Sequence, residues 1–249
     1  FARLRGRFGS GERTQRRVFR FCGLSEAAAD RRLRGLWSRR DKSVEFTILA
    51  GLGLVELHAT ATVGRLDEIE RAVARRMGGL FFGTDSDTLA SALGNRLRRL
   101  GWTVGTAESC TGGLAAELLT RTPGSSDYFL GSIVAYADAL KTAALGVDAS
   151  LLRRHGAVSS PAARAMLAGM RARLGAHTGI AITGIAGPGG GSASKPVGLV
   201  HIAAATPRKT AARRFRFSGT RDQVRRRAAN AALFLLLGLL PETRRPRLT

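Results

Sequence analysis

Short apolar runs separated by polar turns occupy the first third of the chain and predict a small α+β unit. Residues 1–20 are rich in Arg, and we expect about the first 15 of them to be disordered. Ser25 precedes an Ala-rich segment and suits the N-cap of a short helix, because Ser accepts hydrogen bonds from unpaired N–H groups there. Residues 43–50 and 54–63 flank a Gly-rich turn and favour two strands. Residues 67–77 carry apolar side chains at helical spacing and predict an amphipathic helix.

The rest of the chain alternates strand-like and helix-like patterns. Helices are predicted over residues 88–100, 111–121, 161–174 and 221–240, and strands over 103–107, 132–136, 179–183, 197–205 and 211–217. This order is typical of a layered domain with a largely parallel or mixed sheet. We therefore predict the α/β fold class, with a layered α/β/α domain over residues 84–249 and a small α+β domain over residues 1–83.

Composition excludes several classes of protein. The chain has 249 residues, of which 44% are hydrophobic and 23% charged, so it is neither disordered throughout nor collagen-like nor a small disulfide scaffold. Cys22 and Cys110 lie far apart, and the four histidines share no ligand spacing, so we expect neither a disulfide framework nor a metal site. The apolar run 233–240 is about a third of a membrane span. No charged-then-apolar leader opens the chain at Phe1, so we expect a cytoplasmic protein without a membrane partner.

The net charge of +22 comes almost wholly from arginine. Of 40 basic residues 36 are Arg, and the four lysines are Lys42, Lys141, Lys195 and Lys209. A chain this basic adheres to nucleic acid at low salt whatever its function. We therefore expect scattered, solvated arginines and only non-specific binding of nucleic acid.

The first candidate for chemistry is the segment 106–113, Thr-Ala-Glu-Ser-Cys-Thr-Gly-Gly, where a predicted strand meets a predicted helix. Unpaired N–H groups at a helix start attract anions, so Thr111, Gly112 and Gly113 are candidates to bind a phosphate or an oxyanion. The alternative is an ordinary helix start with Ser109 or Thr111 as its N-cap.

The second candidate combines Ser126, Tyr136 and Lys141. Lysine can lose its proton when it is buried, whereas arginine cannot, so a lysine in this arginine-rich chain suits chemistry that needs a neutral amine. A Ser–Lys pair is one way to activate a hydroxyl nucleophile. The alternative is an ordinary solvated lysine at a turn.

The third candidate is the glycine-dense loop between the strands predicted over 179–183 and 197–205. It begins at Thr183 and includes Gly187 and Gly189, and such a loop suits the wrapping of a ligand at the carboxyl edge of a sheet. It matches neither a dinucleotide fingerprint nor a P-loop, and an unstructured hairpin tip is the alternative. Arg221, at the start of the last predicted helix, carries little information by itself in so arginine-rich a chain.

These segments in this order resemble the CinA C-terminal domain family, the group of nicotinamide mononucleotide deamidases. The resemblance covers about residues 86–240 and rests on Ala107-Glu-Ser-Cys-Thr-Gly-Gly, Pro123-Gly-Ser-Ser-Asp-Tyr-Phe, Tyr136 with Lys141, Leu145-Gly-Val, His155-Gly-Ala-Val-Ser, and Thr183-Gly-Ile-Ala-Gly-Pro-Gly-Gly-Gly with Lys195-Pro-Val-Gly. The preceding segment is more loosely similar to the small, KH-like middle domain of full-length CinA proteins.

The resemblance implies hydrolysis of nicotinamide mononucleotide to nicotinic acid mononucleotide and ammonia, without metal or cofactor. It places Ser109, Ser126, Tyr136, Lys141 and Thr183 in the active site, and it matches Arg221 to an arginine before the last helix. The segment Gly219-Thr-Arg departs from the family's Gly-x-Arg in its middle residue. Two smaller departures are Asp138, where Asn is common, and Ser160, where Glu is usual. We expect both to leave the hydroxyl–lysine pair untouched and to affect binding or subunit pairing.

We expect neutral Lys141 to deprotonate a serine that attacks the amide carbon, with Tyr136 orienting the lysine and the substrate ring. Ser126 is the slightly preferred nucleophile and Ser109 the alternative. The other serine, with Thr183 and backbone N–H groups, would donate to the oxyanion. Residues 111–113 and Arg221 would hold the phosphate or ribose.

Two other functions compete with this hypothesis. One is a nucleic-acid-associated protein, since CinA-type proteins are linked by name to competence and DNA damage. The other is a catalytically decayed relative that keeps the fold for assembly. The family tends to form homodimers, and the long apolar helix near the end of the chain is a candidate interface.

Overall fold

The computed structural model describes residues 14–36 and 43–241, which form two compact units that divide between Thr88 and Leu89. Nearly all of the segment expected to be disordered lies outside the described residues.

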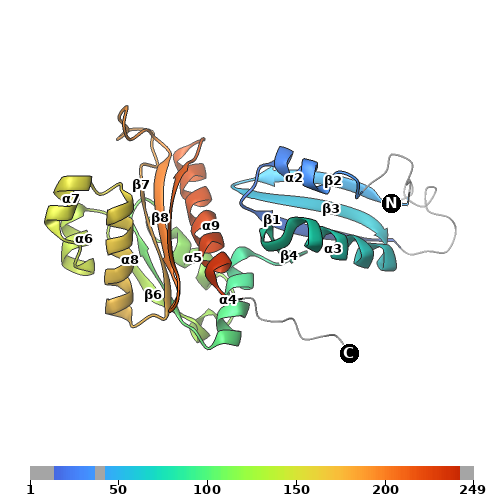
Figure 1. Cartoon of the computed structure of the whole chain (residues 1–249), viewed down its shortest axis with the longest axis horizontal. Helices are drawn as coiled ribbons and strands as arrows, with labels where there is room; N and C mark the ends of the chain where they lie inside the picture. Colours follow the sequence, from blue (N-terminus) through green and yellow to red (C-terminus); the bar gives the residue numbers. More distant parts are fainter. Residues whose placement is uncertain (1–13, 37–42, 242–249) are drawn as a thin grey trace. The chain divides into compact units, whose positions relative to one another are not determined.

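The first unit is a four-stranded antiparallel sheet with helices α2 and α3 (Figure 1). Its strand order is β2-β3-β1-β4. Its elements are β1 (Thr14–Cys22), α2 (Glu26–Leu33), β2 (Glu45–Gly51), β3 (Leu54–Thr62), α3 (Val63–Met77), a 3-10 turn η1 (Gly78–Leu80) and β4 (Phe81–Thr84). Phe19 and Phe21 from β1 and Leu57 from β3 are fully buried against Leu66 and Val73 of α3.

Strand β1 was not predicted, because its arginines hide an alternating pattern. Phe19 and Phe21 point into the core, while Arg20 beside them is partly exposed. Arg17 shares the buried side of the strand but ends in ion pairs with Asp67 and with Glu70 of α3. The predicted strands β2 and β3 are confirmed, Ser25 caps α2 as expected, and α3 begins four residues earlier than predicted.

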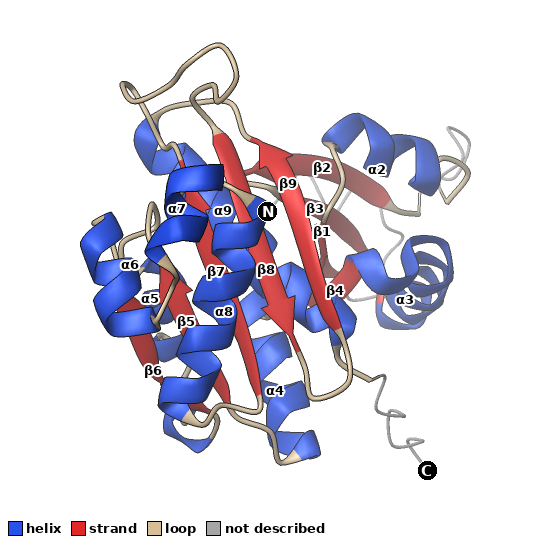
Figure 2. Ribbon diagram, turned by 60° about the vertical axis from the view of Figure 1, so that its left-hand side comes forward, coloured by secondary structure: helices blue, strands red, loops and turns tan. Residues whose placement is uncertain are grey.

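The second unit is a layered α/β/α domain around a mixed five-stranded sheet, as predicted (Figure 2). The strand order is β6-β5-β7-β8-β9, in which β6, β5 and β7 are parallel and β8 and β9 are antiparallel to their neighbours. The strands are β5 (Val104–Glu108), β6 (Phe129–Val134), β7 (Thr178–Gly184), β8 (Leu199–Ala205) and β9 (Thr210–Arg216). The helices are α4 (Leu89–Leu100), α5 (Leu114–Thr120), α6 (Asp138–Leu145), α7 (Ala149–His155), α8 (Ser160–Leu174) and α9 (Arg221–Leu239), with a 3-10 turn η2 (Ser125–Asp127).

Helix α8 covers one face of this sheet, and α5 and α9 cover the other (Figure 2). Gly179 of β7 permits the close approach of α8, since a Cβ there would lie 2.3 Å from the Cε of Met170. Helix α6 packs in turn on α8, where a Cβ on Gly169 would lie 1.7 Å from the carbonyl oxygen of Leu145. Glycines at these contacts therefore fix where α6 lies relative to the sheet.

The sequence patterns missed α6 and α7 and placed several element boundaries two or three residues from their positions in the structure. Helix α6 has only eight residues and α7 only seven, too few for helical periodicity to stand out. Strand β6 ends at Val134 rather than Tyr136, and α5 begins at Leu114 rather than Thr111. None of the helices in the described part of the chain has the length and apolar character that a membrane crossing requires.

Candidate functional site

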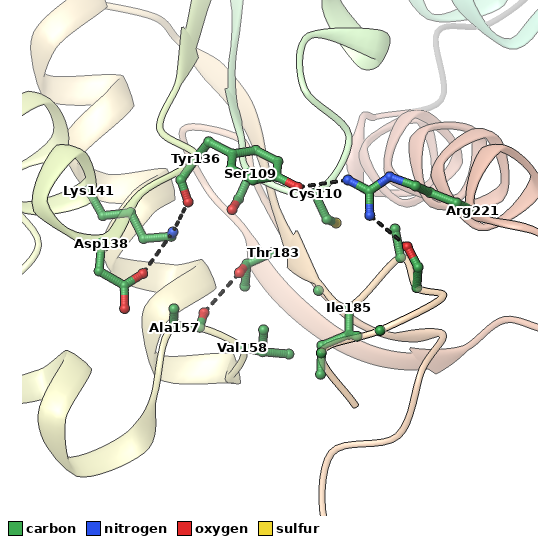
Figure 3. Close-up of a pocket in the computed structure, with 15 residues that line it drawn as sticks. Ser109, Cys110, Tyr136, Asp138, Lys141, Ala157, Val158, Thr183, Ile185 and Arg221 are labelled. Atoms are coloured by element: carbon green, nitrogen blue, oxygen red, sulfur yellow. Dashed lines mark hydrogen bonds and ion pairs between the residues drawn. The ribbon is translucent and has the colours of Figure 1, made fainter. Parts of the chain in front are cut away.

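A pocket of about 240 Å³ opens at the carboxyl ends of β5 and β7 (Figure 3). Side chains far apart in the sequence line it, because parallel strands bring their carboxyl ends to the same edge of a sheet. Its lining includes Ser109, Tyr136, Lys141, Thr183, Gly187, Gly189 and Arg221. The structure thus brings together seven of the residues that the sequence singled out.

The turn between β5 and α5 is held by the fully buried carboxylate of Glu108. This carboxylate accepts hydrogen bonds from the backbone N–H groups of Gly113 at 3.0 Å, Ala115 at 3.0 Å and Ala116 at 2.9 Å. The Glu108 carboxylate therefore already occupies the anion-binding position at the start of α5.

The prediction that this helix start holds the substrate phosphate gains no support from this arrangement and stays a prediction. Thr111, Gly112 and Gly113 are absent from the pocket lining, and the Gly113 N–H donates to Glu108 while the Gly112 N–H donates to the Ser109 carbonyl. The Thr111 carbonyl instead accepts from Arg225 at 2.8 Å. The N-cap alternative is wrong, since the cap position is Gly113 with no side-chain cap bond.

Ser109 follows Glu108 directly, so the same turn aims its side chain. Its backbone N–H donates to the Ile182 carbonyl of β7 at 2.9 Å, which anchors the residue to the sheet. The side chain is directed into the pocket, between Lys141 and Thr183 (Figure 3). Ser109 is buried, with 8% relative exposure.

Lys141 is buried on α6, with 2% relative exposure. Its Nζ donates to the Tyr136 carbonyl at 2.9 Å and to Oδ1 of Asp138 at 3.1 Å (Figure 3). Asp138 lies three residues earlier on the helix, and its side chain is 61% exposed. The expectation that Asp138 leaves the hydroxyl–lysine pair untouched is therefore wrong, because its carboxylate contacts the amine.

Ser126, the preferred nucleophile from the sequence, lies away from this pocket. It is exposed on η2, which directly precedes β6, whereas Tyr136 and Lys141 follow the carboxyl end of β6. The six residues of β6 separate these positions by about 20 Å at the usual rise per residue. Within one chain Ser109 is the serine that shares a pocket with the lysine, and the preference for Ser126 stays a prediction.

Thr183 lines the pocket but uses its only hydroxyl proton elsewhere. Its Oγ1 donates to the Ala157 carbonyl at 2.8 Å, and the residue is 1% exposed. The expected donation to an oxyanion is not available in this arrangement, since a hydroxyl has one proton to give. Thr183 instead holds the wall formed by residues 155–158, which Lys195 also anchors by donating to the His155 carbonyl at 2.8 Å.

Arg221 connects two sides of the pocket. Its Nη2 donates to the Tyr136 hydroxyl at 2.7 Å, and its Nη1 donates to the Gly187 carbonyl at 2.7 Å (Figure 3). The residue opens α9, which begins with a capping box between Thr220 and Gln223. This start of α9 fixes a guanidinium beside the glycine-dense loop.

Sequence reasoning missed Cys110 as a pocket residue because cysteine was weighed only for disulfides and metals. Burial raises the pKa of its thiol to about 12, with the negative charge of Glu108 adding to the shift. The thiol is therefore protonated at neutral pH and is a weak nucleophile. The described residues include no cluster of His, Cys, Asp or Glu that could hold a metal ion.

The comparisons with known proteins concern both sequence and structure. A family model described as CinA C-terminal domain matches residues 86–240. The chain is 45% identical over 245 residues to a CinA-like protein of Gloeobacter violaceus, covering 95% of this chain and 57% of that protein. It is 39% identical over 224 residues to a CinA-like protein of Acidobacterium capsulatum, covering 87% and 54%. The chain thus spans about half the length of the curated relatives it matches.

Several solved structures are similar to this one. The competence/damage inducible protein CihA from Agrobacterium tumefaciens matches with a TM-score of 0.60 and 41% identity, over 61% of this chain and 93% of that chain. A protein of the competence-damaged protein (CinA) superfamily from Escherichia coli matches with a TM-score of 0.59 and 32% identity, over 66% of this chain and 98% of that chain.

Proposed function

The chain belongs to the CinA C-terminal domain family, and from that premise we propose that it hydrolyses the carboxamide of nicotinamide mononucleotide. The products are nicotinic acid mononucleotide and ammonia. The observation that carries the proposal is a serine hydroxyl and a buried lysine amine facing one pocket that also holds a guanidinium. A nucleophile, a base and an anion-binding group are the parts that hydrolysis of a phosphorylated amide needs.

Ser109 is the nucleophile and Lys141 the general base in this proposal. The neutral amine of Lys141 takes the proton from the Ser109 hydroxyl, and the oxygen forms a bond to the amide carbon. Lys141 is buried and lines the same pocket as Ser109, which supports this role. The protonated Cys110 beside Ser109 is a poor competitor for the attack.

Collapse of the tetrahedral intermediate breaks the carbon–nitrogen bond. The leaving nitrogen takes the proton from Lys141 and departs as ammonia, which leaves an ester on Ser109. Water then attacks this ester while Lys141 accepts its proton, and the acid product leaves as the proton returns to Ser109. Each proton that the lysine accepts is therefore given back within one turnover.

Arg221 is the proposed phosphate-binding group, in place of the helix start at residues 111–113. Its guanidinium has five N–H donors, and the Tyr136 hydroxyl and the Gly187 carbonyl each occupy one. The remaining donors and the positive charge suit an anion at the mouth of the pocket. Gly187 and Gly189 leave room there for a ligand, since neither carries a side chain.

Ammonia release from nicotinamide mononucleotide tests the proposal. We expect the wild-type chain to release ammonia and nicotinic acid mononucleotide in equal amounts, and Ser109→Ala to release neither. Ser126→Ala tests the other candidate nucleophile, and we expect it to keep ammonia release because this exposed serine lies outside the pocket of its own chain. Equal release by the wild type and Ser109→Ala, or no release by the wild type, would refute the proposal.

A further inference from the structure

One acidic side chain lines the pocket, and it contacts the lysine proposed as general base. Among the residues that line the pocket, Asp138 alone is acidic. Its Oδ1 accepts a hydrogen bond from the Nζ of Lys141 at 3.1 Å, and its side chain is 61% exposed beside a lysine that is 2% exposed (Figure 3). The Asp138 carboxylate therefore borders both the buried amine and the space that a ligand would enter.

The proposed reaction changes the charge of the group next to Lys141. The carboxamide of the substrate is neutral, whereas the carboxylic acid that replaces it is ionised at neutral pH. This acid comes from the ester on Ser109, so its carboxylate forms beside Ser109 and Lys141, in the pocket that Asp138 also lines. The phosphate, the ribose and the ring are the same in substrate and product. The charge of the carboxyl group therefore distinguishes the two ligands at this end of the pocket.

The negative charge of Asp138 opposes the product in either form of the lysine. Beside a neutral amine, the carboxylates of Asp138 and of the product repel each other. Beside an ammonium, Asp138 compensates a positive charge that would otherwise attract the product, and it takes one of three N–H donors, of which the Tyr136 carbonyl takes another at 2.9 Å. In both cases Asp138 weakens binding of the acid and affects the neutral amide much less.

The other charged groups near the pocket do not make this distinction. Figure 3 shows Asp138 and Lys141 on one side of the pocket and Arg221 on the other, where Arg221 is proposed to hold the phosphate that both ligands share. Glu108 is fully buried, and three backbone N–H groups at the start of α5 donate to its carboxylate. These donors compensate its charge. Asp138 is therefore the residue whose charge acts on the carboxyl group of a ligand.

We propose that Asp138 makes the pocket select the amide over the acid, so that the product inhibits the enzyme weakly. This inference rests on the proposed function, which supplies the two ligands. Asp138 takes no part in the transfer of protons and forms no bond to the substrate. It determines specificity because a ligand with a carboxylate beside Lys141 meets a second negative charge, while a ligand with a carboxamide does not.

Binding of nicotinic acid mononucleotide to the full chain tests the inference without turnover. Asp138→Asn removes the charge and keeps the size of the side chain. By isothermal titration calorimetry we expect this variant to bind the acid about three- to tenfold more tightly than the wild type, a modest effect because solvent screens the exposed carboxylate. An affinity for the acid that does not rise would overturn the inference.

The amide is measured in chains that carry Ser109→Ala, which should bind nicotinamide mononucleotide without hydrolysing it. Its affinity should change by less than about twofold when Asp138→Asn is added to Ser109→Ala, because the carboxamide is neutral. If the affinities for amide and acid rose together, Asp138 would not select between them, and the inference would be overturned.

Asp30→Asn and Asp138→Glu are the matched controls. The Asp30 carboxylate also accepts from a cationic side chain at 3.1 Å, that of Arg34, is 45% exposed and is absent from the pocket lining. Asp138→Glu keeps the charge at the same position. Both variants should bind the acid no more tightly than the wild type. Tighter binding would assign the effect to net charge in Asp30→Asn or to side-chain shape in Asp138→Glu, and either result would overturn the inference.

The inference and the proposed function fail separately. The acid is bound but not converted, so its affinity is measurable even in a chain that releases no ammonia. A selective gain of acid affinity in Asp138→Asn without any release of ammonia would support the role of Asp138 and refute the amidase. Normal ammonia release with an unchanged acid affinity would overturn the inference alone. A chain that binds neither nucleotide would refute both.

Discussion

Each unit of the chain contains a cluster of charged side chains. The two clusters differ in how many of their hydrogen-bond donors and acceptors are paired within the cluster. In the first unit Glu56 contacts both Arg20 and His58 on β1 and β3, and His58 also contacts Arg16. All four side chains alternate with buried residues and lie on the face of the sheet away from α3. In the second unit Lys141 and Arg221 face a pocket instead.

The difference lies in burial and in unused donors. The ion pair of Arg20 with Glu56 joins side chains that are 24% and 28% exposed, whereas Lys141 is 2% exposed and Asp138 61%. Ion pairs between charges that solvent reaches contribute little to the free energy of unfolding. The reactivity of a buried amine beside a cavity depends strongly on the few groups that contact it. A substitution of one of those groups therefore alters that reactivity. We therefore expect the first cluster to matter little for stability or activity, and the second to matter for activity.

The largest expected effect is that of Lys141→Met. The substitution removes the amine and keeps an unbranched side chain, so kcat/KM for ammonia release should fall at least about a thousandfold. Unfolding stability should change little, because Met fills the buried space and the Asp138 carboxylate that loses its partner is 61% exposed and solvated. Thermal unfolding and initial rates measure the two effects. Lys209→Met, at an exposed turn, should alter neither, and a fully active Lys141→Met would contradict the account.

Glu108→Gln should produce the largest loss of stability. The amide keeps one acceptor oxygen and places its own N–H groups against the start of α5, where backbone N–H groups need an acceptor. We expect the free energy of unfolding in urea to fall by about 2–4 kcal/mol, the usual penalty for unpaired buried donors beside a lost charged partner. An unchanged unfolding midpoint would show that Glu108 does not hold the turn that carries Ser109.

Arg221→Ala should separate binding from catalysis. Loss of the guanidinium should raise KM for nicotinamide mononucleotide about 10- to 100-fold and change kcat much less, since the group is proposed to hold the phosphate. Arg226→Ala is the control, because Arg226 lies on the same helix and pairs with Asp222 at 2.8 Å outside the pocket. If both variants raised KM equally, general electrostatic attraction rather than a phosphate contact would be responsible.

Glu56→Gln should have the smallest effect. Its ion pairs are partly exposed, so the free energy of unfolding should fall by no more than about 1 kcal/mol, and kcat/KM should stay at the wild-type value. Steady-state rates and urea unfolding check both expectations. A large loss of activity would mean that the first unit takes part in catalysis, contrary to the comparison above.

The sequence predicted most of the second unit because its strands are apolar and its helices long. It failed where polar side chains have structural roles that pattern alone does not reveal. The arginines of β1 hid a central strand whose Phe19 and Phe21 are buried. The short α6 was missed, although it carries Lys141.

The motifs identified most of the pocket residues but not their contacts. The motifs slightly favoured Ser126 over Ser109, and only the topology, with Ser109 after β5 and Ser126 before β6, shows which of them lies near Lys141 within one chain. Glu108 stands within the first motif, yet nothing in its spacing says that its carboxylate would occupy the helix start. The contact of Asp138 with Lys141 depends on a helical turn that the sequence did not predict.

A double-mutant cycle on Ser109 and Lys141 tests the central claim most directly. We compare kcat/KM for ammonia release in the wild type, Ser109→Ala, Lys141→Met and the double variant. If the two residues act as one catalytic unit, the double variant should be no slower than the slower single variant. Losses that multiply, or a Ser109→Ala variant that keeps wild-type activity, would contradict the account.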